Sequence, residues 1–109
     1  MIVRIWRTRI DERRAADYDA FVGSKSMPMF RCQPGFLGAL FASDGSKRLV
    51  ISLWRDRSSA GVLHESSTYV STVGELEATG ILIGTSAVEV LQLDRLLILD
   101  RGALVEVEG

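Results

Sequence analysis

The sequence predicts an α+β protein with the ferredoxin-like order of elements, β-α-β-β-α-β, and an antiparallel sheet. Runs rich in β-branched and aromatic residues alternate with stretches in which apolar residues recur at helical spacing. A short Asp-Gly turn separates the second run from the third, which indicates a hairpin at that point. Both of these runs are almost entirely apolar, as expected for a sheet that is covered on both faces.

The first half of the chain supplies one strand and one helical region. Residues 2–8 (IVRIWRT) form the first predicted strand, because β-branched and aromatic side chains favour an extended backbone. Asp11 is the predicted N-cap of a helix over residues 12–25, in which apolar side chains repeat at helical spacing. A further helical turn is expected over residues 26–33, and the Pro-Gly pair at 34–35 should end it.

The second half of the chain supplies the other strands and helices. Strands are expected over residues 36–43, 48–55 and 86–93. Between the last two, Asp56 should cap a short helix and Ser67 a longer one. Gly80 is in the usual position to end the longer helix, because glycine adopts the left-handed backbone conformation found there.

A chain of 109 residues is expected to form one domain. Residues 1–95 hold the ferredoxin-like unit, and residues 96–109 add two short apolar runs around Asp100-Arg101-Gly102. We expect this last segment to be a hairpin or a tail that packs on a partner subunit. A mean hydropathy of +0.17 is high for so short a chain and favours a homodimer. Two copies of the sheet would then pair as a dimeric α/β barrel.

Composition excludes several classes of protein. A net charge of −1 and a pI near 5.8 give no reason to expect a nucleic-acid partner. Cys32 is the only cysteine, so no intrachain disulfide can form, which suits a reducing compartment. No apolar stretch reaches the roughly 20 residues that span a bilayer, and the first residues lack the apolar core of a signal peptide. We therefore expect a cytoplasmic protein with no membrane partner.

The segment MFRCQPGFLGALF (29–41) is followed by VISLWRD (50–56), and then by a helix and a tyrosine. This combination resembles the antibiotic biosynthesis monooxygenase family of dimeric α/β barrels, and the resemblance covers residues 2–93. It implies a cofactor-independent monooxygenase that oxidises a small aromatic, polyketide or quinol-type substrate with O₂. It also implies a pocket between sheet and helices in each subunit, without metal, flavin or haem.

The resemblance also suggests a role for one tryptophan. Trp54 matches a family tryptophan that lines the pocket and can donate its indole N–H to a substrate oxygen. The family also places an asparagine four residues before this tryptophan and a tyrosine six residues after it. Those positions are Val50 and Ala60 in this chain, so two of the three polar groups are absent.

Seven residues are candidates for the site. Trp54 and His64 are the candidate catalytic residues, since a buried indole N–H needs an acceptor and histidine titrates near neutral pH. The candidate substrate-binding residues are aromatic or flexible side chains expected on the inner side of strands and helices: Trp6, Tyr18, Met29, Phe36 and Tyr69. The alternative for each of them is a packing role, and for His64 a surface position.

Two other functions fit the same pattern. One is a non-catalytic dimer that binds small molecules, which an apolar pocket without converging polar groups would favour. The other is a polyketide cyclase or isomerase, which His64 would favour if it pointed inwards near Glu65 or Glu89. A metal site is not expected, because one histidine without converging carboxylates cannot supply three ligands.

Overall fold

The computed structural model describes residues 1–108, although not the side chains of residues 103–105. Its principal strands and helices are β1 (Ile2–Ile10), α1 (Ala15–Phe21), α2 (Met27–Arg31), β2 (Phe36–Asp44), β3 (Lys47–Trp54), α3 (Arg57–Gly61), α4 (Ser67–Ala78), β4 (Leu82–Gln92), β5 (Arg95–Asp100) and β6 (Ala103–Glu108). The first four strands form one sheet in the order β2-β3-β1-β4, with every neighbouring pair antiparallel. The predicted ferredoxin-like fold is confirmed.

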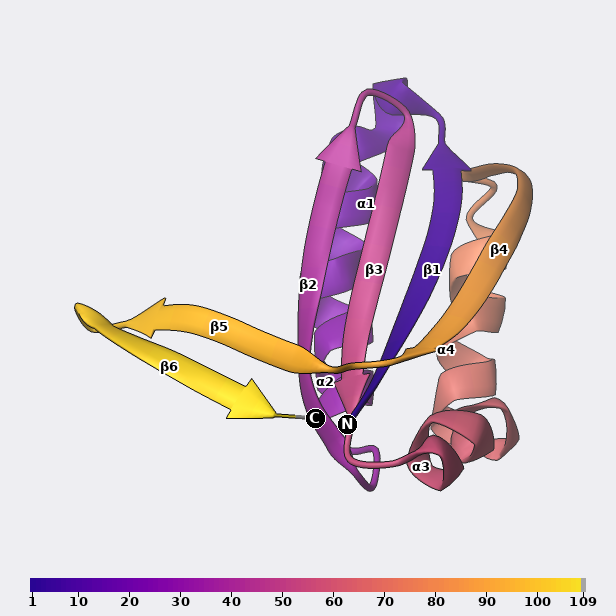
Figure 1. Cartoon of the computed structure of the whole chain (residues 1–109). Coiled ribbons are helices and arrows are strands. Elements are labelled where there is room, and N and C mark those ends of the chain that lie inside the picture. The colour runs from indigo at the N-terminus through magenta and orange to yellow at the C-terminus, as the bar shows by residue number, and fades with distance from the viewer. Residues whose placement is uncertain (109) are drawn as a thin grey trace.

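The helices lie on one face of this sheet and leave the other face open (Figure 1). Along β1 the even-numbered residues point toward the helices, and four of these five side chains are buried. The open face carries side chains such as Leu40, which is more than half exposed. The sheet does not close on itself within one chain, so a barrel can arise only if a second sheet covers the open face.

The helical region between β1 and β2 contains a π-helical segment, Val22–Ser26, between α1 and α2. The N–H of Met27 donates to the carbonyl of Val22, five residues earlier. Pro28 follows directly, and its ring would clash with the carbonyl four residues before it in a regular α-helix. The wider turn therefore lets one helical run pass through a proline without breaking.

Short polar residues begin the helices on the other side of the hairpin. Asp56 caps α3 as predicted, and its carboxylate accepts the N–H of Ser59 at 2.8 Å. The cap of α4 is Ser66, whose hydroxyl accepts the N–H of Tyr69, so the prediction of Ser67 is wrong by one residue. Gly80 has φ +73° just beyond α4, as expected for a glycine that ends a helix.

Strand β4 begins at Leu82, four residues before the predicted start at residue 86. The register with β1 shifts between Arg7, opposite Ala87, and Arg9, opposite Ile83. Gly84 lies in this irregular stretch with φ +71°. The glycine allows a bulge that continues the strand where the sequence indicates a loop.

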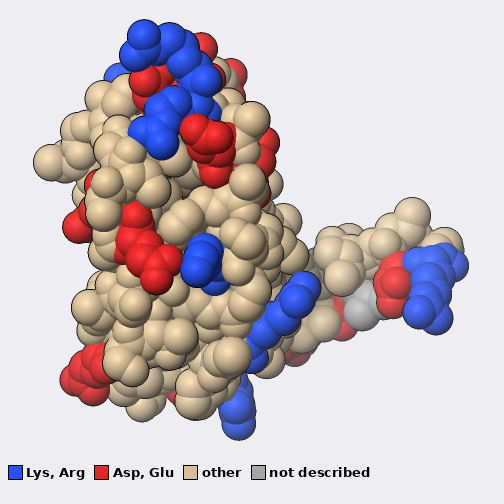
Figure 2. All heavy atoms as spheres, turned by 180° about the vertical axis from the view of Figure 1, so that it is seen from behind, with Lys and Arg blue, Asp and Glu red and all other residues tan. Residues whose placement is uncertain are grey.

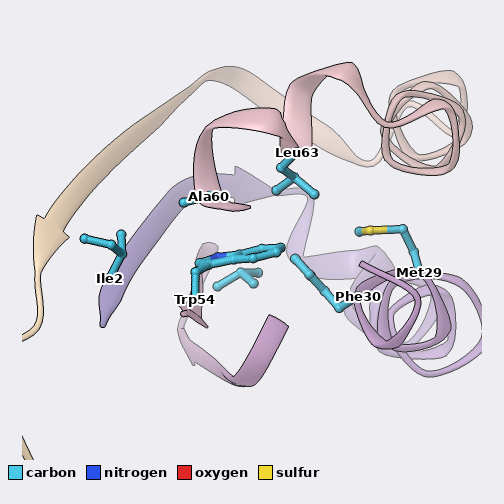
Figure 3. Close-up of a cluster of buried hydrophobic side chains, with 7 residues drawn as sticks. Ile2, Met29, Phe30, Trp54, Ala60 and Leu63 are labelled. Carbon is cyan, nitrogen blue, oxygen red and sulfur yellow. The ribbon is translucent and has the colours of Figure 1, made fainter. Parts of the chain in front are cut away.

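Two clusters of buried side chains fill the space between sheet and helices. The larger one contains Ile2, Met29, Phe30, Val50, Trp54, Ala60 and Leu63. Figure 3 shows the Trp54 ring at its centre, beneath Ala60 and Leu63, with Phe30 near its edge. The smaller cluster, at the other end of the sheet, contains Ile10, Tyr18, Leu76 and Ile81. Trp6 packs against both clusters and lies between them.

Strands β5 and β6 form a separate hairpin that projects away from the main sheet (Figure 1). Its turn has positive φ at both Arg101 and Gly102, which is the backbone of a type I′ turn. Leu97 and Leu99 of this hairpin are exposed. The expected packing of this segment on a partner subunit stays a prediction, and Gly109 lies outside the described residues.

No helix in the described part of the chain is long and apolar enough to cross a membrane. Residues 1–108 also contain no group of three or more His, Cys, Asp or Glu side chains placed to hold a metal ion. On the helix-covered side, charged side chains of both signs are interspersed among uncharged ones (Figure 2).

Candidate functional site

A cavity of about 50 Å³ lies between the sheet and the helices. Its walls are mainly aromatic and aliphatic, and come from β1, β2, β3 and the helices that cover them: Arg4, Trp6, Tyr18, Phe21, Ser26, Met29, Phe30, Phe41, Val50, Tyr69, Thr72, Val73 and Leu76. A volume of this size holds one or two water molecules, since each occupies about 30 Å³ in the liquid. A ring-shaped ligand can enter only if the lining side chains move.

Among the described residues, Arg4 is the only one with a cationic side chain that lines this cavity. The residue is 2% exposed, because its position on β1 turns the side chain toward the helices. One guanidinium nitrogen, Nη2, donates to the Tyr69 hydroxyl at 3.0 Å. Nε is buried and has no hydrogen-bond partner among the described residues. None of the ion pairs found within residues 1–108 includes Arg4.

Tyr69 is half-buried on α4 and connects Arg4 to the outer surface. The guanidinium carbon of Arg4 lies 5.5 Å from the centre of the Tyr69 ring. His64 packs edge-on against that ring, with the two ring centres 5.8 Å apart. His64 is exposed and does not line the cavity. A contact of His64 with Glu65 or Glu89, which would favour a cyclase or isomerase, is not present among the described hydrogen bonds and ion pairs, and Glu89 pairs with Arg7 instead.

Trp54 lies in the larger core cluster and not in the cavity wall. It is 0% exposed, and its indole N–H donates to the Ser52 hydroxyl at 2.8 Å. Ser52 in turn donates to the backbone carbonyl of Arg4 at 3.4 Å. The acceptor that we expected from a substrate is therefore supplied within the protein, two residues away on the same face of β3.

Of the five expected substrate-binding residues, four line the cavity: Trp6, Tyr18, Met29 and Tyr69. Phe36 does not, because its ring stacks on Phe30 at 5.5 Å and meets the edge of Trp54 at 5.6 Å. The indole N–H of Trp6 has no partner among the hydrogen bonds of the described residues. Trp6 and Trp54 share a face of the sheet but do not form one wall together.

Burial raises the pKa of the Tyr18 hydroxyl above its usual value. The guanidinium of Arg48, 5.6 Å from the centre of the Tyr18 ring, opposes this effect but does not cancel it. Tyr18 therefore stays neutral at pH 7, and its hydroxyl keeps the proton that a hydrogen-bond donor needs.

Arg4 is the important residue that the sequence analysis missed. The signal for it is the alternation along β1, which places residues 2, 4, 6, 8 and 10 on the inner face. An arginine at an inward position of a covered strand is unusual, since arginine is rarely fully buried without a paired carboxylate.

A larger hollow of about 550 Å³ lies on the open face of the sheet. Its rim is basic, with Arg7, Arg9, Lys47 and Arg48 against a single acid, Asp44. The arginines at positions 7 and 9 are exposed, and the hollow has no wall on its outer side. Since the open face is the surface that a second sheet would cover, its volume in a single chain is not that of an enclosed pocket.

Searches against family models and against curated proteins found no match. Solved structures do match. SnoaB from Streptomyces nogalater, a cofactor-independent oxygenase, is 14% identical with a TM-score of 0.68, over 84% of this chain and 91% of the other. The ActVA-Orf6 monooxygenase of Streptomyces coelicolor, in complex with nanaomycin D, is 16% identical with a TM-score of 0.69, over 84% and 86%. A third structure, described as an antibiotic biosynthesis monooxygenase, is 16% identical with a TM-score of 0.63, over 85% and 98%.

The chain has the fold of the antibiotic biosynthesis monooxygenases. At these identities the likeness establishes the fold and not the reaction. Another neighbour of the same quality, from Nitrosomonas europaea with 14% identity and a TM-score of 0.70, is of unknown function. The covered share of 84% corresponds to about 92 of 109 residues, which is close to the length of the chain up to the end of β4.

Proposed function

We propose that this protein is a cofactor-independent monooxygenase that binds a small aromatic or quinol-type substrate in the cavity between sheet and helices. The observation that carries the proposal is the composition of this cavity: mainly aromatic and aliphatic walls with a few polar groups among them. The lining side chains that carry a polar group are Arg4, Trp6, Tyr18, Ser26, Tyr69 and Thr72, and Arg4 donates to the Tyr69 hydroxyl. Two structural neighbours described as oxygenases support the same class of reaction.

The reaction that fits such a site uses the substrate itself as the reductant. At a ring CH₂ group, two C–H bonds break and one atom of O₂ becomes the new carbonyl oxygen. The second oxygen atom leaves as water with both hydrogens, so no external electron donor is needed. The protein's part is to bind the ring, exclude water and favour loss of the first proton by holding the resulting oxyanion.

The cavity has to enlarge for this function, because typical ligand pockets measure about 300–1,000 Å³. Met29 and Phe41 are suited to move. The methionine side chain is flexible, and Phe41 lies on the edge strand β2, where it is 38% exposed. Binding should therefore displace side chains rather than strands.

The test is oxygen uptake with a panel of anthrones and naphthohydroquinones, under air and under nitrogen. We expect product and consumed O₂ in equal amounts, and a lower turnover number in Tyr69→Phe and Trp6→Phe. His64→Gln tests whether the exposed histidine accepts the proton. If it does, the turnover number should fall while the affinity for substrate is unchanged. Binding without oxygen-dependent product would instead favour a non-catalytic binding protein.

A cyclase or isomerase is the less favoured candidate, because His64 is exposed and contacts Tyr69 instead of a carboxylate. Product formed equally well under nitrogen would favour this function over the monooxygenase.

We also propose that the protein acts as a homodimer through the open face of the sheet, with the β5–β6 hairpin packed on the partner. The exposed Leu97 and Leu99 have no cover within the described chain. Removal of residues 95–109 should raise the dimer dissociation constant, measured by analytical ultracentrifugation. An unchanged dissociation constant would contradict the role given to the hairpin.

A further inference from the structure

We infer that Arg4 is an anion-binding residue, and that the ligand of this cavity is an aromatic compound with an ionised oxygen next to its ring. The inference rests on the proposed function for the location of the site, and adds the charge of the ligand. The shared chemistry is an aryl oxyanion, which either a phenolate or a carboxylate can supply.

The first argument is the cost of the present arrangement. A charged group inside a protein is expensive unless a counter-charge and hydrogen bonds compensate it. Arg4 is 2% exposed and receives one neutral partner, the Tyr69 hydroxyl. Its Nε is buried without an acceptor among residues 1–108, and the described ion pairs do not include it. The site therefore lacks one negative charge.

The second argument is the position of the guanidinium. It borders a cavity whose other walls are largely aromatic and aliphatic, so an anion with an apolar body would match both the guanidinium and these walls. Guanidinium groups bind planar oxyanions through two parallel N–H donors, and such charge-assisted bonds are stronger than neutral ones. Tyr69 orients the group by accepting from Nη2 and leaves its remaining donors for a ligand.

The third argument compares Arg4 with other arginines. Arg48 also has a buried Nε without a partner, but it is only half-buried and its Nη1 donates to the backbone carbonyls of residues 45 and 47. Arg7, three residues along the same strand, points to the open face, is about half exposed and pairs with Glu89 at 3.1 Å. Arg14 and Arg13 pair with acids at the surface. These side chains are solvated or compensated, whereas Arg4 is neither. A buried cation kept without a counter-ion is expected where function, and not stability, requires it.

The test compares ionised and neutral probes of the same shape. One pair is 2-hydroxy-1,4-naphthoquinone, which is ionised at neutral pH, and its 2-methoxy ether. The other pair is naphthalene-2-carboxylate and naphthalene-2-carboxamide. Isothermal titration calorimetry measures each affinity for the wild type, Arg4→Met and Arg7→Met. The two pairs distinguish a phenolate-type ligand from a carboxylate.

We expect the wild type to bind at least one ionised probe about 10- to 100-fold more tightly than its neutral partner, as charge-assisted hydrogen bonds allow. Arg4→Met should abolish this preference, and its affinity for the neutral probe should stay within about 3-fold of the wild-type value. Arg7→Met should keep it, although Arg7 borders the basic hollow on the open face. Without ligand, Arg4→Met should be at least as resistant to urea as the wild type, since it removes an uncompensated buried charge.

Equal affinity for ionised and neutral probes would overturn the inference and leave the aromatic cavity as a binding site. A preference that depends on Arg7 would also overturn it, by moving the anion to the open face. If Arg4→Met does not fold, Arg4→Lys is the second variant, because it keeps the charge but removes the planar guanidinium. The difference in binding free energy between ionised and neutral probes should then be less than half of the wild-type difference. Oxygen uptake is not measured in any of these experiments, so their outcome is independent of whether the protein is an oxygenase.

Discussion

Replacing Trp54 by phenylalanine should destabilise the protein without weakening ligand binding. Trp54 is 0% exposed at the centre of the larger core cluster, and its N–H donates to Ser52 at 2.8 Å. Loss of three ring atoms removes about 1 kcal/mol of burial. A residual cavity of about 40 Å³ costs about 1 kcal/mol more, and the lost hydrogen bond about another 1 kcal/mol.

The expected decrease in the free energy of unfolding is therefore about 3 kcal/mol, or a melting temperature lower by about 13 °C for a domain of this size. Urea unfolding followed by far-UV circular dichroism measures it, at one fixed protein concentration because a dimer would make stability concentration-dependent. Affinity for 2-hydroxy-1,4-naphthoquinone should change less than about 3-fold, because Trp54 does not border the cavity.

Trp6→Phe is the matched control, because Trp6 is half-buried and does line the cavity. Trp6→Phe should lower the free energy of unfolding less than Trp54→Phe does. It should weaken binding of 2-hydroxy-1,4-naphthoquinone more than Trp54→Phe does. The reasoning would be refuted if Trp54→Phe lowered the free energy of unfolding by less than about 1 kcal/mol while affinity fell 10-fold or more. That result would place the indole of Trp54 in contact with ligand.

Three further predictions concern stability. Gly35→Ala should be strongly destabilising, because φ is +78° and an added Cβ would lie within 2.5 Å of the Ser59 Cβ; the double variant with Ser59→Gly should recover part of the loss in urea unfolding. Burial holds the pKa of Tyr18 above 10.0, so stability should decline as pH rises beyond this value, and Tyr18→Phe should make the decline shallower. The Ser59 N–H holds the pKa of Asp56 below 3.8, so the stability that Asp56 contributes is present above this pH and lost as pH falls through the lowered value. The free energy of unfolding of Asp56→Ala should be lower than that of the wild type at pH 7, and the two values should converge in acid. A difference that stays constant with pH would contradict this.

Sequence reasoning located the elements because their signals are local. The Asp-Gly turn between β2 and β3, the Asp56 cap and the left-handed Gly80 each depend on a few neighbouring residues. The errors came where a local signal has two meanings. Two adjacent serines can both cap α4, and Ser66 does so. Gly84 indicates a loop in the sequence but forms a bulge inside β4, because the neighbouring strand β1 continues the pairing on both sides.

The site was predictable in part for the same reason. Helical spacing predicted that Tyr18 and Tyr69 face the sheet, and Trp6 and Met29 were candidates as an aromatic and a flexible side chain; all four line the cavity. Trp54 has the same inward direction and differs only in what surrounds it. Near the Trp54 end of β3, α3 and the residues after it pack Ala60 and Leu63 onto the ring, so no space remains beside it (Figure 3).

By itself, the sequence determined the order of strands and helices in the ferredoxin-like unit, because β-branched runs, helical periodicity and turn residues are local signals. Only the tertiary structure decided which inward side chains meet. Arg4 and Tyr69 are 65 positions apart, yet they form a hydrogen bond at the cavity, where the Nε of Arg4 has no partner among the described residues. Such neighbours depend on how helices cross the sheet, since packing brings together residues that no local pattern relates.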